Sequence, residues 1–164
     1  MSDDTPIVIV GTGLAGYSTA RELRKLDTST PIVLVTGDGG WFYSKPMISN
    51  ALGRGQAPMD LPTATAEEMA GDLSARVLTR TRVERIDTAA RTVTAGGETI
   101  AYRDLVLALG ADPVRPKLAG DAVDRVLSIN DLDDYVRFRA ALDGRRRVAV
   151  LGAGLIGSEF ANDL

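Results

Sequence analysis

The sequence contains neither cysteine nor histidine. The absence of cysteine excludes a CxxC redox pair, a thiolate nucleophile and a cysteine-ligated metal from these 164 residues. The absence of histidine removes the commonest general base and the commonest metal ligand. Any redox chemistry in this stretch of chain must therefore be carried by a bound organic cofactor.

Long apolar runs and an excess of positive charge are missing as well. No apolar run approaches the ~18 residues that a membrane-spanning helix requires, and the acidic start, residues 1–4, argues against a signal peptide. The net charge is −3, which provides no electrostatic footprint for nucleic acid. With 45% apolar and 25% charged residues, the composition predicts an ordinary cytoplasmic α/β protein without a membrane or nucleic-acid partner.

The beginning of the chain predicts a βαβ unit. Residues 6–10 form a short β-branched run, and apolar residues three and four apart predict a helix that extends from 14 to about 27. Residues 31–35 are apolar on both faces, which is typical of a strand buried in a parallel sheet.

A glycine-rich turn, with Gly11, Gly13 and Gly16, joins the first strand to the helix. In such a turn the first glycine permits the tight bend, the second lets a pyrophosphate approach the backbone, and the third lets helix and strand pack closely. A single motif of this kind is a weak signal, because glycine-rich turns also occur without a ligand. We interpret it as a dinucleotide site, with a purely structural turn as the alternative.

The middle of the chain predicts a loop-rich stretch at 37–62 and then a series of short elements. These are a short helix at 46–52, a helix at 65–73 with a capping box, strands at 76–79 and 104–109, an antiparallel meander at 83–88, 92–95 and 98–102, a linker at 112–121, and a helix at 130–142 capped by Asn130 or Asp131.

A second glycine motif contains Gly152, Gly154 and Gly157, with a strand expected at 145–151 and a helix that reaches Leu164. Two such motifs imply two dinucleotides, and the economical pair is FAD with NAD(P)H. The fold predicted is a Rossmann-like FAD/NAD(P)-binding domain, with a parallel sheet and an antiparallel meander, over residues 1–115. Residues 116–164 are predicted to be a linker and the truncated beginning of a second Rossmann-like NAD(P)-binding domain.

The motifs GTGLAG, YSKP, TRV, DLVLALG and GAGLIGSEFA, in this order, resemble those of the pyridine nucleotide-dependent flavoprotein reductases. The YSKP and INDLDDY segments are most similar to the rubredoxin–NAD reductase group. The resemblance covers essentially the whole chain, but only the front part of such an enzyme. It implies a flavoprotein that passes electrons from NAD(P)H through FAD to rubredoxin or a similar small carrier, and it implies that these residues alone are inactive.

Three alternatives stay open. A ferredoxin reductase, or another NAD(P)H oxidoreductase of the same fold, would share every motif. A nucleotide-binding module without turnover would share the glycine turns. The absence of cysteine argues against the disulfide-reductase branch, whose redox pair would normally lie in this region.

The resemblance also implies roles for individual residues around the first motif. Thr12, Leu14 and Ala15, with the glycine between them, would contact the FAD pyrophosphate. The family usually has an acid for the ribose after the second strand, and this chain has Thr36 and Gly37 there. A hydroxyl and backbone would then replace the carboxylate, with the next residue, an aspartate, as a fallback.

Two further positions carry an ordinary structural alternative. The backbone of Val83 would pair with the adenine edge, unless this is a plain strand valine. Gly110 would lie near the cofactor or merely end its strand.

Lys45 has the most specific implied role. In the family the lysine of this motif lies beside the flavin ring, where a fixed cation favours the anionic reduced flavin. Glu159 matches the glutamate that pairs with this lysine, so we expect a Lys45–Glu159 contact. The alternative is a solvated lysine and an acid favoured by the helix dipole. No residue is expected to act as a catalytic nucleophile or general base.

Overall fold

The structure, a computed structural model, describes residues 5–164 and divides into two compact units. Unit 1 comprises the chain up to residue 43 and residues 62–110; unit 2 comprises residues 44–61 and 111–164. The segment 44–61 thus packs with the later part of the chain, whereas the boundary read from the sequence placed everything up to residue 115 in one domain.

Unit 1 is built on a parallel sheet of four strands in the order β3-β2-β1-β7. The sheet and its helices are β1 (Ile7–Val10), α1 (Leu14–Leu26), β2 (Ile32–Val35), α2 (Ala66–Leu73), β3 (Arg76–Leu78) and β7 (Asp104–Leu107). The predicted βαβ unit, the later helix and the two later strands are confirmed, with ends shifted by one or two residues.

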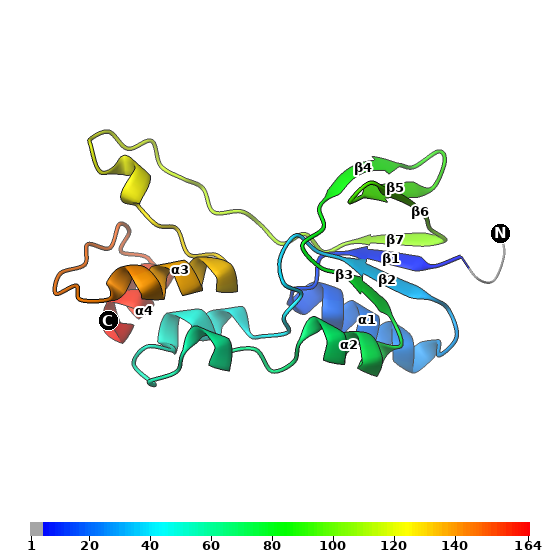
Figure 1. Cartoon of the computed structure of the whole chain (residues 1–164), viewed down its shortest axis with the longest axis horizontal. Helices are drawn as coiled ribbons and strands as arrows, with labels where there is room; N and C mark the ends of the chain where they lie inside the picture. The colour runs from blue at the N-terminus through cyan, green and yellow to red at the C-terminus, as the bar shows by residue number, and fades with distance from the viewer. Residues whose placement is uncertain (1–4) are drawn as a thin grey trace. The chain divides into compact units, whose positions relative to one another are not determined.

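The two faces of this sheet bury alternate residues of each strand, because side chains in a strand point to opposite faces in turn. Ile7 and Ile9 of β1 belong to an apolar cluster with residues of α1 and α2, including Tyr17 and Met69. The intervening Val8 and Val10 belong to a second cluster, with the meander. In Figure 1, α1 and α2 cover one face of the sheet and the meander covers the other.

The meander is the second sheet of unit 1, and it is antiparallel as predicted. Its strands are β4 (Val83–Asp87), β5 (Thr92–Ala95) and β6 (Glu98–Ala101). Val93, Ala95 and Ile100 face the parallel sheet and are buried. Because both faces of the parallel sheet are covered, its two central strands, β1 and β2, are apolar and buried throughout.

Local signals in the sequence explain where α2 begins. The Thr65 hydroxyl accepts a hydrogen bond from the Glu68 amide at 3.1 Å, and the Glu68 carboxylate accepts one from the Thr65 amide at 2.7 Å. This reciprocal capping box satisfies two amides that have no partner within the helix. The hydrogen bonds that the Thr65 amide and, secondly, the Thr65 hydroxyl donate to the Glu68 carboxylate lower the pKa of Glu68.

Unit 2 is helical. It contains η1 (Lys45–Asn50), η2 (Pro58–Asp60), η3 (Val123–Arg125), α3 (Leu132–Leu142) and α4 (Leu155–Asp163). Asp131 caps α3 by accepting from the Asp134 amide at 2.7 Å. The rings of Phe138 and Phe160 meet edge to face, with centroids 5.7 Å apart, and join α3 to α4. The guanidinium of Arg139 donates to the Gln56 carbonyl at 2.7 Å.

The strand expected at 145–151 does not form. A strand requires a neighbouring strand for its backbone hydrogen bonds, and unit 2 has no strand among its described residues. Val148, Val150 and Leu151 are therefore left 42–66% exposed. The apolar pattern predicted a strand here, but the pattern alone does not supply the neighbouring strand.

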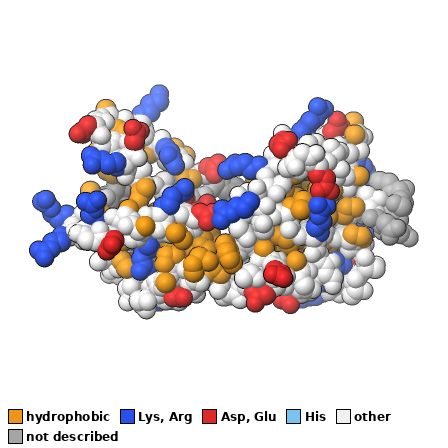
Figure 2. All heavy atoms as spheres, in the orientation of Figure 1, with side chains coloured by type: hydrophobic (Ala, Val, Ile, Leu, Met, Phe, Trp, Pro, Cys, Tyr) orange, Lys and Arg blue, Asp and Glu red, His pale blue; other side chains and the backbone are white. Residues whose placement is uncertain are grey.

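No helix in residues 5–164 has the length and apolar character needed to cross a bilayer. Basic and acidic side chains both appear on the face drawn in Figure 2, in keeping with the small net charge of −3.

Candidate dinucleotide-binding sites

The first glycine turn connects β1 to α1 and leaves no room for side chains at two of its glycines. Gly11 has φ +108°, and a Cβ on it would lie 2.1 Å from the carbonyl oxygen of Ala108. A Cβ on Gly16 would lie 1.9 Å from the carbonyl oxygen of Gly11. These two glycines are therefore required by the packing of α1 and β7 against β1, whatever the turn binds.

Gly13 differs from its two neighbours in the motif. It is the N-cap of α1, with φ −66° and ψ −173°, and a Cβ on it would meet nothing within 4 Å. No side chain caps this helix end and its first turn contains no acid. The first amides of a helix have no acceptor within the helix, so this end combines free donors with the positive end of the helix dipole. The open space beside Gly13 fits a pyrophosphate group.

The parallel sheet brings several predicted positions to one edge. Thr12 follows β1, Thr36 follows β2 and Gly110 follows β7, and the carboxyl ends of parallel strands share one edge. The Thr81 amide donates to the Thr36 carbonyl at 2.8 Å, so β4 begins close to the end of β2. The site residues predicted around the first motif therefore lie in one region of unit 1, although they are spread over about a hundred residues of sequence.

The loop after β2 is organised around Asp38. Its carboxylate accepts hydrogen bonds from the Thr36 hydroxyl and the Gly40 amide, both at 2.8 Å. The Thr12 hydroxyl lies 3.5 Å from the same oxygen. Thr36 is buried, and its hydroxyl donates inside the loop. The exposed backbone of Gly37 is consequently the more accessible part of the predicted ribose position.

Tyr17 supports this loop from beneath. Its hydroxyl donates to the Gly40 carbonyl at 2.6 Å, and its ring is fully buried against Phe42. Burial, and secondly the charge of Asp38, raises the pKa of Tyr17 to about 12. The phenol therefore stays neutral and keeps its proton on the hydrogen bond to Gly40 at physiological pH.

Val83 and Gly110 are placed as predicted, at the beginning of β4 and after the end of β7. β4 is an edge strand, so part of its backbone is unpaired in the meander. Gly110 has φ +68°, a left-handed conformation that favours glycine.

The second glycine turn, in unit 2, repeats the backbone of the first. Gly152 has φ +112°, and Gly154 is the N-cap of α4 with φ −76° and ψ 180°. A Cβ on Gly157 would lie 2.2 Å from the Gly152 carbonyl oxygen, whereas a Cβ on Gly154 would meet nothing within 4 Å. The helix again has no side-chain cap and no acid in its first turn. The second turn thus has the same open N-cap, without a β-ladder before it.

Lys45 and Glu159 both lie in unit 2, but each has a different partner from the one expected. The Lys45 ammonium donates to the Asn130 side-chain oxygen at 2.7 Å. The Glu159 carboxylate accepts from the hydroxyl of Ser49 at 2.7 Å. Ser49 is four residues beyond Lys45 in η1, so α4 brings its glutamate to the serine and the direct Lys45–Glu159 contact is not formed.

Two side chains at the junction of η1 and α4 were missed from the sequence. Ser49 is 4% exposed, and its hydroxyl lies between the Pro46 carbonyl, at 3.1 Å, and the Glu159 carboxylate. Asp163 accepts hydrogen bonds from two successive amides after η1, at 3.0 and 2.7 Å. Ser49, in a short helix, and Asp163, near the end of the sequence, carry no local signal, because their partners lie more than a hundred residues away.

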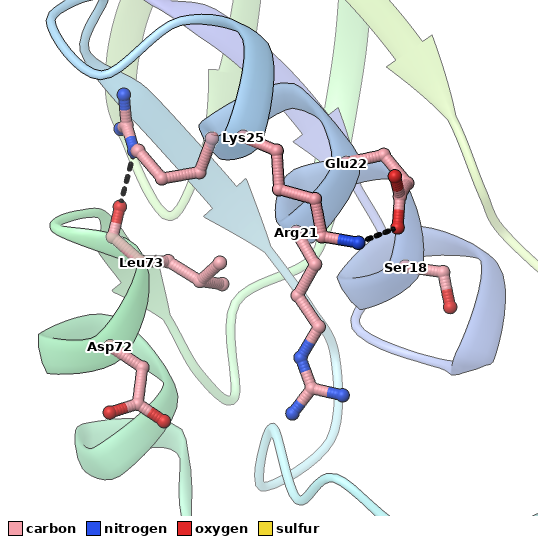
Figure 3. A pocket seen from close by; sticks show the side chains of 7 residues that line it. Ser18, Arg21, Glu22, Lys25, Asp72 and Leu73 are labelled. Atoms are coloured by element: carbon pink, nitrogen blue, oxygen red, sulfur yellow. Dashed lines mark hydrogen bonds and ion pairs between the residues drawn. The ribbon is translucent and has the colours of Figure 1, made fainter.

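A surface groove of unit 1 lies between α1 and α2, away from the glycine turn (Figure 3). Its lining residues are Ser18, Arg21, Glu22, Arg24, Lys25, Asp72 and Leu73. Arg24 crosses it and donates to the Leu73 carbonyl at 2.8 Å. The groove contains none of the predicted site residues, and the hydrogen bond of Arg24 connects α1 to α2. Residues 5–164 also contain no cluster of acids able to hold a metal ion.

Known proteins similar to this chain belong to a family of nucleotide-dependent oxidoreductases, in agreement with the two glycine turns. The family model described as pyridine nucleotide-disulphide oxidoreductase matches residues 5–164. The rubredoxin-NAD(+) reductases of Alcanivorax borkumensis and Acinetobacter baylyi are 53% and 46% identical to the chain over 159 and 165 residues. Each comparison covers 97% of this chain and 42% of the relative, so the chain spans about two fifths of the length of these relatives.

Solved structures show the same fold. The crystal structure of the covalent putidaredoxin reductase–putidaredoxin complex matches with a TM-score of 0.84 and 29% identity, over 99% of this chain and 40% of the other.

Proposed function

Because the chain belongs to the pyridine nucleotide-disulphide oxidoreductase family, we propose that its protein is an FAD-dependent NAD(P)H reductase that passes electrons to rubredoxin or a similar small carrier. The observation that carries this proposal is the pair of glycine turns with matching backbone geometry, one in each unit. The choice of rubredoxin is supported by the names of the two relatives at 53% and 46% identity.

We assign FAD to unit 1 and NAD(P)H to the second glycine turn. Backbone at Thr12, Gly13 and the first residues of α1 would hold the FAD pyrophosphate, and the backbone at Gly37 and Val83 would face the adenosine. When bound, the flavin supplies a hydride acceptor that can release electrons singly. The chain's own residues bind and orient, which agrees with the absence of histidine and cysteine.

The contacts of η1 with its neighbours support a role in orientation. Lys45 is held by Asn130, and Glu159 is held by Ser49, which is itself buried. Each functional side chain is thus fixed by a neutral partner rather than by the other. In the proposed role, Lys45 would supply a fixed cation to the flavin. Glu159 lies in the first turns of α4, the helix that follows the second glycine turn.

The test uses purified full-length protein. We expect a yellow protein whose flavin absorption is bleached by NADH without air and restored by oxidised rubredoxin. Colourless, folded protein would instead identify a nucleotide-binding module without turnover. Reduction by NADH without transfer to rubredoxin would refute the assigned acceptor while leaving the flavin assignment intact.

A ferredoxin reductase is the second candidate, and it is favoured by the likeness to the solved ferredoxin reductase of Rhodopseudomonas palustris, with a TM-score of 0.85 and 29% identity over 96% of this chain. The two candidates differ only in the acceptor, so the same reduced enzyme is offered rubredoxin and a [2Fe–2S] ferredoxin in parallel. The carrier with the higher kcat/KM is the one that the protein serves.

Lys45→Ala tests the place assigned to the lysine. Loss of a nearby cation should destabilise the anionic reduced flavin and lower its midpoint potential, by roughly 30 mV for each 1.4 kcal/mol of lost interaction in a two-electron couple. Lys117→Ala, at an exposed lysine of unit 2, is the matched control and should leave the potential unchanged. An equal potential in both variants would count against the position proposed for Lys45.

We also propose a cytoplasmic location, because reduced nicotinamide nucleotides are generated inside the cell. Fractionation of cells, with immunodetection of the protein, tests this.

A further inference from the structure

Arg82 lies against the backbone at the end of β2. Its Cγ, Nε and Cζ atoms are 3.4, 3.8 and 4.0 Å from the position that a Cβ on Gly37 would occupy. The guanidinium end of the side chain is therefore close to the face that Gly37 leaves bare. Gly37 and Arg82 are both exposed, so the outer side of the Arg82 side chain is open to a ligand.

Backbone hydrogen bonds fix the segment from which Arg82 projects. The Thr36 amide donates to the Leu78 carbonyl at 2.9 Å, and the Thr81 amide donates to the Thr36 carbonyl at 2.8 Å. The Arg80 amide donates to the Asp38 carbonyl at 2.8 Å. Three bonds thus bind the turn between β3 and β4 to the loop after β2, and they hold the base of the Arg82 side chain in place.

The guanidinium of Arg82 has no interaction partner among the described residues. No hydrogen bond or ion pair of its side chain exists in residues 5–164. Arg85, three residues later in β4, differs: it pairs with Asp87 at 3.2 Å. An arginine that is held in place but unpaired has a planar face and donors available for a ligand.

Arg82 lies in the region where the adenosine of a bound dinucleotide is expected. In a Rossmann-like βαβ unit the pyrophosphate lies at the glycine turn and the adenosine lies beyond the end of the second strand. Gly37 is at that end here, and the family's acid for the ribose is missing. A guanidinium stacks well on a flat π system, and it does so without requiring a charged group on the ligand.

We infer that Arg82 is a binding residue for the adenosine half of the nucleotide in unit 1, and that its guanidinium stacks on the adenine base over Gly37. The inference rests on the assignment of a dinucleotide to unit 1. Together with the backbone of Val83, the next residue, Arg82 would provide the base contacts that the buried hydroxyl of Thr36 does not.

The experiment separates the base from the phosphates. Binding of ADP and of inorganic pyrophosphate to the chain is measured by isothermal titration calorimetry or, for weak affinities, by amide chemical shifts. Arg82→Ala should raise the Kd for ADP by roughly two- to fivefold, the range for an exposed cation–π contact, and should leave the Kd for pyrophosphate unchanged. Arg85→Ala removes the same charge three residues later, in β4, and is the matched control, with both affinities unchanged.

A lysine at position 82 distinguishes stacking from charge. Arg82→Lys keeps the positive charge and loses the planar guanidinium, so we expect its ADP affinity to resemble that of Arg82→Ala. Full ADP affinity in Arg82→Lys, or an equal loss of pyrophosphate binding in Arg82→Ala, would overturn the stacking contact. Unchanged ADP binding in Arg82→Ala would overturn the inference altogether.

The same titrations show which proposal has failed. If the unaltered chain binds neither ADP nor pyrophosphate, the dinucleotide site in unit 1 is refuted, and Arg82 with it. If it binds both, with shifts of the amides of residues 11–16, and Arg82→Ala does too with equal affinity, the site in unit 1 stands and only the role of Arg82 is lost.

Discussion

Substitution of Gly13 by alanine should separate binding from folding, because Gly13 is the one glycine of its motif that the packing does not require. A methyl group on Gly13 meets nothing within 4 Å, and its φ of −66° is open to any residue. Alanine reduces the conformational entropy of the unfolded chain, which stabilises by about 0.4–1 kcal/mol. It is also a poorer N-cap than glycine, at a cost of about 0.5–1 kcal/mol. The free energy of unfolding should therefore change by less than about 1 kcal/mol.

Gly16→Ala should behave in the opposite way. Its Cβ would lie 1.9 Å from the Gly11 carbonyl oxygen, and real Cβ atoms essentially never approach such atoms closer than 3.0 Å. Helix α1 would have to move away from β1 by about an ångström, in the middle of a buried interface. Overpacking of this kind costs roughly 1–3 kcal/mol and sometimes more. We expect a large fall in stability for Gly16→Ala and almost none for Gly13→Ala.

ADP binding, in contrast to stability, should be weakened by Gly13→Ala. In Gly13→Ala the new methyl group occupies the space assigned to the pyrophosphate, so the Kd for ADP should rise by about tenfold or more, as expected for the loss of a charge-assisted contact worth about 1.4 kcal/mol. Urea unfolding followed by circular dichroism gives the stability, and calorimetry gives the affinity. Gly71→Ala, in the exposed part of α2, is the control: it should gain up to about 1 kcal/mol and bind ADP normally.

Two results would refute this reasoning. If Gly13→Ala unfolds as easily as Gly16→Ala, the whole turn is a structural element, as the alternative interpretation of the motif holds. If Gly13→Ala is stable and binds ADP as well as the unaltered chain does, no phosphate lies against this backbone.

Three further substitutions test contacts seen in the structure. Tyr17→Phe leaves the buried Gly40 carbonyl without its donor and should cost roughly 1–3 kcal/mol at neutral pH. Because burial raises the pKa of Tyr17 from 10.0 to about 12, the unaltered chain should lose stability between these pH values, and the variant should show a smaller loss in urea titrations. Asp27 has its pKa lowered by the threonine hydroxyl three residues later and by two amides. Its contribution is present above the ordinary aspartate pKa and disappears as pH falls below it, so Asp27→Asn should flatten the acid limb of the stability curve; an unchanged limb would contradict this. Ser49→Ala removes the donor to Glu159 and should cost roughly 1–2 kcal/mol, with recovery in Ser49→Thr; an unshifted urea midpoint would show that this hydrogen bond is replaced by water.

Most elements of unit 1 were predictable because their signals are local. The capping box at Thr65 and Glu68, the β-branched runs of β1 and β2, and the turn spacing of the meander each depend on residues a few positions apart. The glycine motifs are local as well, and the structure shows the tight turn at Gly11 and the close contact at Gly16 that the motif requires.

The failures share a different cause. The segment 145–151 has the composition of a strand, but a strand exists only where another strand accepts its hydrogen bonds. The partners of Lys45 and Glu159 depend on how η1, α3 and α4 pack, since Glu159 meets Ser49 and not Lys45, four residues earlier in the same helix. Neither outcome is encoded in a short window of sequence.

By itself, the sequence determined the two glycine turns and the strand pattern of the parallel sheet. It also determined that a chain without cysteine or histidine must leave redox chemistry to a cofactor. Only the tertiary structure decided which residues meet. It placed Arg82 over Gly37, set Ser49 against Glu159, and joined residues 44–61 to the second unit. The physical reason is that local propensities act over a few residues, whereas side-chain partners are selected by packing between segments far apart in the chain.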